Sequence, residues 1–229
     1  MHANSNPVAS PQTGPHHRLA ALVRKHQAQP FLKPPAPYSN AAYQRFLAAR
    51  APCQAVILDA CCGTGESSLM LARRHPQHLV VGVDQSAQRL ARGLAQPGPP
   101  PNLLLLRADM VDFWRLLAAA GVVLAAHYLL YPNPWPKPAQ LMRRWPAHPV
   151  FPTIVALGGQ LECRSNWRVY AEEFAAALRL VSGRAPTFEI IAAAQGLSPF
   201  ERKYHQSGHT LYRVAADLGA GGTSSRAET

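Results

Sequence analysis

The residues with the clearest chemical potential form the stretch Tyr131-Pro132-Asn133-Pro134-Trp135-Pro136-Lys137. It follows an apolar run, Val122 to Leu130, that predicts a buried strand. Prolines on both sides of Asn133 hold its amide in a stiff turn at the strand end. An amide, the flat ring of Trp135 and the cation of Lys137 on one rigid loop suit recognition of a nucleobase and its phosphate. The competing interpretation is a proline-rich surface turn with an anchoring tryptophan.

A second group of residues forms a glycine-rich turn between a predicted strand and a predicted helix. The turn reads Asp59-Ala60-Cys61-Cys62-Gly63-Thr64-Gly65-Glu66 and runs into a helical pattern. Gly63 and Gly65 let a ligand approach the backbone, and the helix start points N–H groups at it. Phosphate, dinucleotide and nucleoside binders all use such turns, and so do ordinary tight strand-to-helix connections.

Three aspartates at the ends of successive predicted strands narrow the choice of ligand. Asp59 would repel a pyrophosphate and favours a ligand with an ammonium group. Asp84 lies nineteen residues after Gly65, a spacing at which a carboxylate accepts hydrogen bonds from ribose hydroxyls. Asp109 ends the third strand, within reach of an adenine amino group. Together they predict S-adenosylmethionine as cofactor, although each aspartate alone also fits a cap or a turn.

With these motifs in order, residues 55–213 resemble the class I methyltransferases and, more closely, the bacterial tRNA (guanine-N7)-methyltransferase family. Residues 131–137 are similar to that family's F-P-D-P-W-x-K. The stretch Arg164-Ser165-Asn166-Trp167-Arg168-Val169-Tyr170-Ala171-Glu172 is similar to its T-D-W-x-x-Y-A-E, and Ser198-Pro199-Phe200-Glu201 is similar to its T-x-F-E. The resemblance implies an enzyme that methylates N7 of a guanine in the variable loop of tRNA.

The resemblance also implies roles for individual residues. Asp59, Asp84 and Asp109 match cofactor-binding positions, and Asn133 matches a catalytic aspartate that also contacts the cofactor. On the substrate side we expect contacts to the guanine or its RNA from Trp135, Lys137, Arg144, Asn166, Ser198, Phe200 and Glu201. Within this set we assign Lys137 and Arg144 to the RNA backbone.

Several residues depart from the family pattern. Asn133 and Asn166 stand where the family carries aspartate, Cys61 replaces the first glycine of the turn, and residues 138–142 lack a basic, histidine-bearing run. Guanine N7 carries a lone pair and no proton, so its methylation needs no general base and positioning can still act. An amide stabilises the positive charge on the methylated purine less well than a carboxylate. We therefore expect a retained but slower reaction.

Two alternatives remain open at this point. The Asn133-Pro134-Trp135 loop resembles the N/D-P-P-Y/F/W loop of amino-group methyltransferases, although Trp135 stands where a second proline is expected. Such an enzyme would methylate an exocyclic amine on RNA or another substrate. From a different class, the chain would be a non-catalytic RNA- or cofactor-binding paralogue that lost its carboxylates.

The amino-acid composition limits which kinds of partner the protein is expected to bind. Lys and Arg total 23 against 12 Asp and Glu, a formal net charge of +11, which favours a polyanion such as tRNA. No apolar segment approaches the roughly 20 residues of a membrane span, and the N-terminus lacks a signal-peptide core, so we expect a cytoplasmic protein without a membrane partner. The four cysteines and ten histidines show no metal-ligand spacing, so we expect reduced thiols and no metal. The sequence allows a monomer or a homodimer.

Alternating strands and helices must position these residues. The sequence predicts strands near 55–60, 79–83, 103–107, 122–130, 159–164, 187–193 and 209–215, and helices near 66–74, 86–95, 111–120, 149–157 and 168–181. This order indicates an α/β methyltransferase domain over 51–215, with a doubly wound, mostly parallel seven-stranded sheet whose last strands form an antiparallel hairpin. We expect disorder over 1–17 and 216–229. Over 18–50 we expect a helical segment, with one helix over 18–29 and a second from an Asn40 cap to Arg50.

Overall fold

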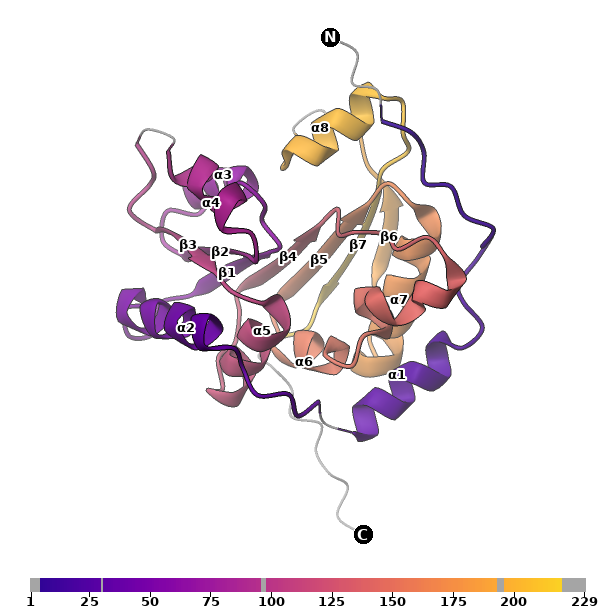
Figure 1. Cartoon of the computed structure of the whole chain (residues 1–229), viewed down its shortest axis with the longest axis horizontal. Helices are drawn as coiled ribbons and strands as arrows, with labels where there is room; N and C mark the ends of the chain where they lie inside the picture. Colours follow the sequence, from indigo (N-terminus) through magenta and orange to yellow (C-terminus); the bar gives the residue numbers. More distant parts are fainter. Residues whose placement is uncertain (1–4, 30, 96–97, 193–195, 220–229) are drawn as a thin grey trace.

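The computed structural model describes residues 5–29, 31–95, 98–192 and 196–219, which fold around one seven-stranded sheet (Figure 1). Its order is β3-β2-β1-β4-β5-β7-β6. The first five strands of this order are parallel, and β7 is antiparallel to both of its neighbours. The predicted mostly parallel sheet with an antiparallel final pair is therefore confirmed. The strands are β1 Val56–Ala60, β2 Leu79–Asp84, β3 Leu103–Arg107, β4 Ala126–Leu130, β5 Gln160–Ser165, β6 Thr187–Ile190 and β7 Tyr212–Asp217.

Helices cover both faces of the sheet because successive side chains of its central strands point to opposite sides. Ile57 packs with α3 on one face, whereas Leu58 belongs to the main core with α5, α6 and α7 on the other. All residues of β1 and β2 are buried, which explains why these strands carry no polar side chain other than Asp59 and Asp84. The α-helices are α1 Leu19–Ala28, α2 Pro37–Ala49, α3 Glu66–Arg74, α4 Ala87–Leu94, α5 Met110–Ala119, α6 Phe151–Ala156, α7 Arg168–Ser182 and α8 Pro199–Gln206; two 3-10 helices span Pro138–Arg143 and Trp145–Ala147.

Several predicted boundaries are wrong. Helix α2 begins at Pro37, because proline is favoured in the first turn, so Asn40 lies inside the helix and does not cap it. Strand β4 begins at Ala126; Val122 and Leu124 before it are buried, but they lie outside the strand. No helix was predicted between residues 193 and 209, but Ser198 caps α8, which lies between β6 and β7 in the chain.

The terminal segments also differ from expectation. We expected disorder over 1–17, yet residues 5–17 follow a defined path along the surface, with hydrogen bonds to distant parts of the chain (Figure 1). Ala216 and Asp217, which we assigned to the tail, belong to β7. Residues 1–4 and 220–229 lie outside the described part. Within the described ranges, no helix has the length and apolar character required to cross a membrane.

A buried ion pair ties the loop after β4 to helix α7. The Arg144 Nη1 atom lies 2.7 Å from Glu173 Oε1, and both side chains are 0% exposed. The guanidinium also donates to the carbonyl oxygens of Trp135 (3.0 Å) and Lys137 (3.4 Å). A charge buried without a partner is costly, so each member of this pair requires the other.

We expect Glu173→Gln to lower the free energy of unfolding by about 3–5 kcal/mol, because it leaves the buried Arg144 cation without its carboxylate. Urea denaturation of purified protein measures this change. The matched control is Glu172→Gln, which removes the exposed pair of Glu172 with Arg168. An exposed pair of this kind contributes at most about 1 kcal/mol. Equal losses in the two variants would contradict a structural role for the buried pair.

Candidate functional site

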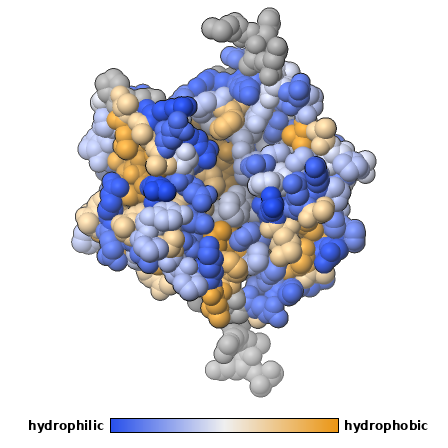
Figure 2. Space-filling model, viewed as in Figure 1, coloured by the Kyte–Doolittle hydropathy of each residue, from blue (hydrophilic) through white to orange (hydrophobic). Residues whose placement is uncertain are grey.

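Residues from β1, the glycine-rich turn, β4 and α8 border one pocket at the carboxyl end of the sheet. The cavity measures about 130 Å³. Figure 2 shows this face as mainly hydrophilic, with a hollow between the α3–α4 part and the α8 part. Of the predicted site residues, the structure brings Asp59, Gly63, Ser198 and Phe200 together here. The other lining residues include Thr64, Ser67, Arg89 and Leu130.

Asp59 presents an unsatisfied carboxylate oxygen in this pocket. The side chain is buried, and its Oδ2 atom accepts hydrogen bonds from the hydroxyls of Ser67 and Ser68, both at 2.6 Å. Among the described residues, the Oδ1 atom has no hydrogen-bond partner. Burial raises the pKa of Asp59 to about 6, although the two serine hydroxyls partly offset this effect. A cationic group in the pocket would compensate the buried charge and satisfy Oδ1.

Asp84 organises the glycine-rich turn. Its Oδ2 atom accepts a hydrogen bond from the Gly63 backbone N–H (2.9 Å), and its Oδ1 atom accepts one from the Ser86 N–H (2.8 Å). The Arg89 guanidinium lies 3.1 Å from the same Oδ1 atom. A ribose bound at Asp84 would therefore share its carboxylate with the backbone of the turn and with Arg89. The ribose contact itself stays a prediction.

The turn depends on backbone conformations that favour glycine. Cys61, Gly63 and Gly65 have φ angles of 59°, 63° and 76°. Cys61 thus adopts the conformation for which the family's glycine is suited. The left-handed φ of Gly65 would strain any side chain there, and a Cβ would also lie 2.9 Å from the Leu105 methyl groups, so the helix start favours glycine. Asp109 accepts a hydrogen bond from the Val111 N–H (2.9 Å) and caps α5; its adenine contact also stays a prediction.

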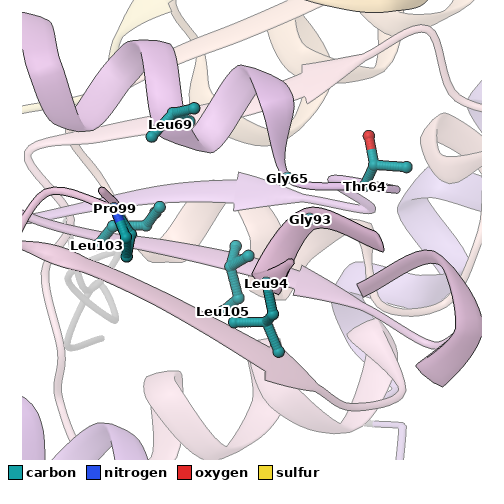
Figure 3. A pocket seen from close by; sticks show the side chains of 8 residues that line it. All are labelled: Thr64, Gly65, Leu69, Gly93, Leu94, Pro99, Leu103 and Leu105. Carbon is teal, nitrogen blue, oxygen red and sulfur yellow. The ribbon is translucent and has the colours of Figure 1, made fainter. Parts of the chain in front are cut away.

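Gly65 borders a different, apolar pocket between α3, α4 and β3. Figure 3 shows leucine side chains around it, including Leu69, Leu94 and Leu105. The cavity measures about 90 Å³, and Thr64 supplies the polar side chain in its lining. Without a charged group, it suits an amino-acid-bearing cofactor less well than the Asp59 pocket.

The loop over residues 131–137 presents three predicted residues at the surface. Asn133 is exposed, and its Oδ1 atom accepts a hydrogen bond from the Trp135 N–H at 3.3 Å. Tyr131 and Trp135 have φ angles of 53° and 46°, so both occupy the left-handed region. The Arg143 guanidinium lies 4.7 Å from the centre of the Trp135 ring, and Lys137 is exposed. A cation stacked on an indole next to an exposed amide suits contact with a base and its backbone.

Two residues expected to contact the substrate are instead engaged inside the protein. Arg144 is fully buried against Glu173, so its guanidinium holds the loop and does not face an RNA backbone. Glu201 is also buried; its carboxylate forms an ion pair with Arg164 at 2.8 Å and accepts a hydrogen bond from the Tyr131 hydroxyl at 3.1 Å. The expected contacts of Arg144 with RNA and of Glu201 with guanine are therefore corrected.

Asn166 lies apart from the Asp59 pocket. It lines a cavity of about 370 Å³ beside residues 207–210, at the other end of α8 from Ser198 and Phe200. Its Nδ2 atom lies 3.0 Å from His209 Nδ1. The predicted residues thus occupy both ends of α8, with the loop over 131–137 linked to this helix through the Tyr131–Glu201 hydrogen bond.

The sequence reasoning missed three residues that support the site. Ser67 and Ser68 hold Asp59, and their position directly after the glycine-rich turn was an available signal. Glu173 follows Glu172 in α7 between the buried residues Tyr170 and Phe174, and a carboxylate within an apolar stripe indicates a buried partner.

Comparison with known proteins agrees with this architecture. Residues 53–214 match a family described as "Putative methyltransferase". The chain is 30% identical to a tRNA (guanine-N(7)-)-methyltransferase of Leifsonia xyli, over 66% of this chain and 70% of that protein. A protein of the same name from Anaeromyxobacter dehalogenans is 31% identical over 69% of this chain and 82% of that protein. The chain spans about half the length, 53%, of a further relative of this name from Streptomyces coelicolor.

Solved structures share the fold at low identity. The crystal structure of the 16S rRNA methyltransferase KamB superimposes with a TM-score of 0.54 and 19% identity, covering 80% of this chain and 94% of that one. A second solved structure, an antibiotic-related methyltransferase, gives a TM-score of 0.56 at 14% identity, covering 81% and 96%. With the family match over residues 53–214 and the relatives at 30–31% identity, the chain belongs to the tRNA (guanine-N7)-methyltransferase family of class I methyltransferases.

Proposed function

We propose that this protein transfers a methyl group from S-adenosylmethionine to N7 of a guanine in the variable loop of tRNA. The observation that carries the proposal is the Asp59 pocket. Its walls combine the glycine-rich turn with Leu130, which directly precedes the loop over 131–137, and with Ser198 and Phe200 of the third family motif. This shared lining supports a site in which the cofactor and the acceptor base lie close together.

The residues at this pocket fit the cofactor. The free, buried Asp59 Oδ1 atom matches an ammonium group, and the turn through Gly63 allows close approach to the backbone. Asp84 and Asp109 stand at the neighbouring strand ends for the ribose and the adenine. When bound, the cofactor supplies an electrophilic methyl group on a sulfonium.

On the acceptor side, the chain's task is positioning. Guanine N7 has a lone pair available and no proton to lose, so no side chain needs to act as a base. The buried guanidinium of Arg144 fixes the backbone that presents Asn133 and Trp135. Holding acceptor and donor in line can supply several kcal/mol of the barrier reduction. The Asn133 carbonyl oxygen can accept a hydrogen bond from guanine N1–H or from its amino group.

The electrostatics of the acceptor side favour a slow enzyme. Asn133 and Asn166 are amides, and the Glu201 carboxylate is neutralised by Arg164. None of these three positions offers a free negative charge to the cationic methylated purine. The net charge of +11 supports RNA attraction without adding such a charge at the acceptor.

A second candidate is methylation of an exocyclic amine. It is favoured by the exposed Asn133 amide, whose oxygen can accept a hydrogen bond from an attacking amino group. Both reactions use the same loop but give different nucleosides.

The test incubates purified protein with S-adenosylmethionine and undermodified bulk tRNA, followed by digestion and mass spectrometry of the nucleosides. We expect new 7-methylguanosine. An N-methylated amino nucleoside would replace the proposal by the second candidate. Absence of any methylated nucleoside, with cofactor binding intact, would contradict both and favour a binding-only paralogue.

Cofactor affinity should depend on the ionisation of Asp59. Its pKa of about 6 means that the carboxylate that attracts the ammonium group is present above pH 6 and is lost as the pH falls through 6. We expect the dissociation constant to be on the order of tenfold higher at pH 5 than at pH 7 by linkage, measured by calorimetry. Asp59→Asn should bind weakly at both pH values. Tight, pH-independent binding by wild type would contradict the role of Asp59.

Restoring a carboxylate in the loop should accelerate the reaction. For Asn133→Asp we expect N7 transfer to rise by about tenfold, since a charge at the developing cation stabilises the transition state. Single-turnover assays with tRNA measure the rate. Asn40→Asp, on the exposed surface of α2, adds the same charge elsewhere and should leave the rate unchanged. A rate for Asn133→Asp equal to or below that of wild type would count against the weakened-family-member account.

A further inference from the structure

The N-terminal strap, residues 5–16, is attached to the acceptor side of the site. It runs from α8 toward α1 along the surface (indigo in Figure 1) and has no regular secondary structure over residues 5–10. Its hydrogen bonds reach residues more than 120 positions away in sequence. These contacts involve the loop over 131–137, the buried pair of Arg144 and Glu173, and the surroundings of Asn166. We call these elements the acceptor side, because they are expected to hold the base that receives the methyl group.

Gln12 completes the buried ion pair. Its Oε1 atom accepts hydrogen bonds from Nη1 and Nη2 of Arg144, both at 3.1 Å, and its Nε2 atom donates to Glu173 Oε1 at 2.8 Å. The His16 N–H donates to the same Glu173 oxygen at 3.0 Å. One amide thus bridges both charges, so the strap takes part in holding the guanidinium that fixes the loop.

Ser10 holds the loop directly. Its hydroxyl donates to the Pro136 carbonyl oxygen at 2.6 Å. Arg144 donates to the carbonyl oxygens on either side, those of Trp135 and Lys137. Three consecutive carbonyl groups are therefore held, two by the buried arginine and one by the strap. This matters because Trp135 has a left-handed backbone, which needs surrounding contacts to persist.

The beginning of the strap borders the cavity of Asn166. Pro7 and Val8 line this cavity, and Val8 also packs against the main core. His209 connects the two sides: its Nε2 atom lies 2.8 Å from the Ser5 carbonyl oxygen and its Nδ1 atom 3.0 Å from Asn166 Nδ2. With the Ser5 carbonyl as acceptor, Nε2 carries the proton and Nδ1 accepts from the amide. The strap therefore fixes the orientation of Asn166 through His209.

We propose that the N-terminal strap is a positioning element of the acceptor site, with Gln12 and Ser10 setting the loop over 131–137 and Ser5 setting Asn166 through His209. The proposal rests on the proposed function for its catalytic consequence. Within the described residues, the strap forms no hydrogen bond with Asp59, Asp84 or the glycine-rich turn, so its effect falls on the acceptor and not on the cofactor.

The first test compares Gln12→Ala, Ser10→Ala and the double variant with Gln27→Ala, a matched control on the exposed surface of α1. We expect the double variant to lose on the order of 10- to 100-fold in kcat, because small misplacements of an acceptor have effects of this size. Its dissociation constant for S-adenosylmethionine should stay within about twofold of wild type. Ser10→Ala leaves the buried ion pair intact, so this single variant replaces the double variant in the test if Gln12→Ala folds poorly.

The second test measures hydrogen exchange in peptides spanning residues 133–147, which requires no enzymatic activity. We expect faster exchange there in the double variant and unchanged exchange in Gln27→Ala. Unchanged exchange and unchanged kcat would overturn the proposal. A uniform rise in exchange over the whole chain, with cofactor affinity and kcat falling together, would also overturn it and show a general role in stability.

The two readouts separate this proposal from the proposed function. If wild type methylates no tRNA, the proposed function fails, and exchange over residues 133–147 still decides whether the strap positions the loop. If wild type methylates tRNA and the double variant matches it in kcat and exchange, the strap proposal alone fails.

Discussion

The acceptor side of the molecule depends on the buried ion pair between Arg144 and Glu173. Burying two charges costs desolvation free energy. The Arg144 guanidinium is fully hydrogen-bonded because Glu173, Gln12 and the carbonyl groups of Trp135 and Lys137 surround it. A loop with three prolines and two left-handed residues thereby acquires one conformation. The arginine that we expected to contact RNA instead holds the loop that presents Asn133 and Trp135.

Charge is distributed differently on the two sides of the site. On the cofactor side, Asp59 keeps one buried carboxylate oxygen without a partner among the described residues, which suits a cationic ligand. On the acceptor side, Asn133 and Asn166 are neutral and Glu201 is paired with Arg164. The protein therefore combines a cofactor pocket typical of the fold with an acceptor side that stabilises a cation poorly. The reduced rate that we propose rests on these neutral or paired side chains.

The sequence predicted what periodicity and strand-end chemistry encode: the sheet, the glycine-rich turn and the aspartates at the ends of β1 and β2. It did not predict which charged residues would be buried, because the pairs Arg144–Glu173 and Arg164–Glu201 form between segments that are distant in sequence. Helix α8 was missed although Ser198 and a following proline form a recognisable helix start. Gln12 lies in a polar, proline-bearing segment whose composition suggests disorder, and only tertiary contacts show its role.

The acceptor that we propose, a guanine in the variable loop of tRNA, is tested most directly by one measurement. A tRNA transcript and the same transcript with its variable-loop guanines replaced by adenine are incubated with wild-type protein and radiolabelled S-adenosylmethionine. We expect label in the first transcript, located in the variable loop by cleavage at 7-methylguanosine, and none in the second. Equal incorporation into both transcripts would contradict it.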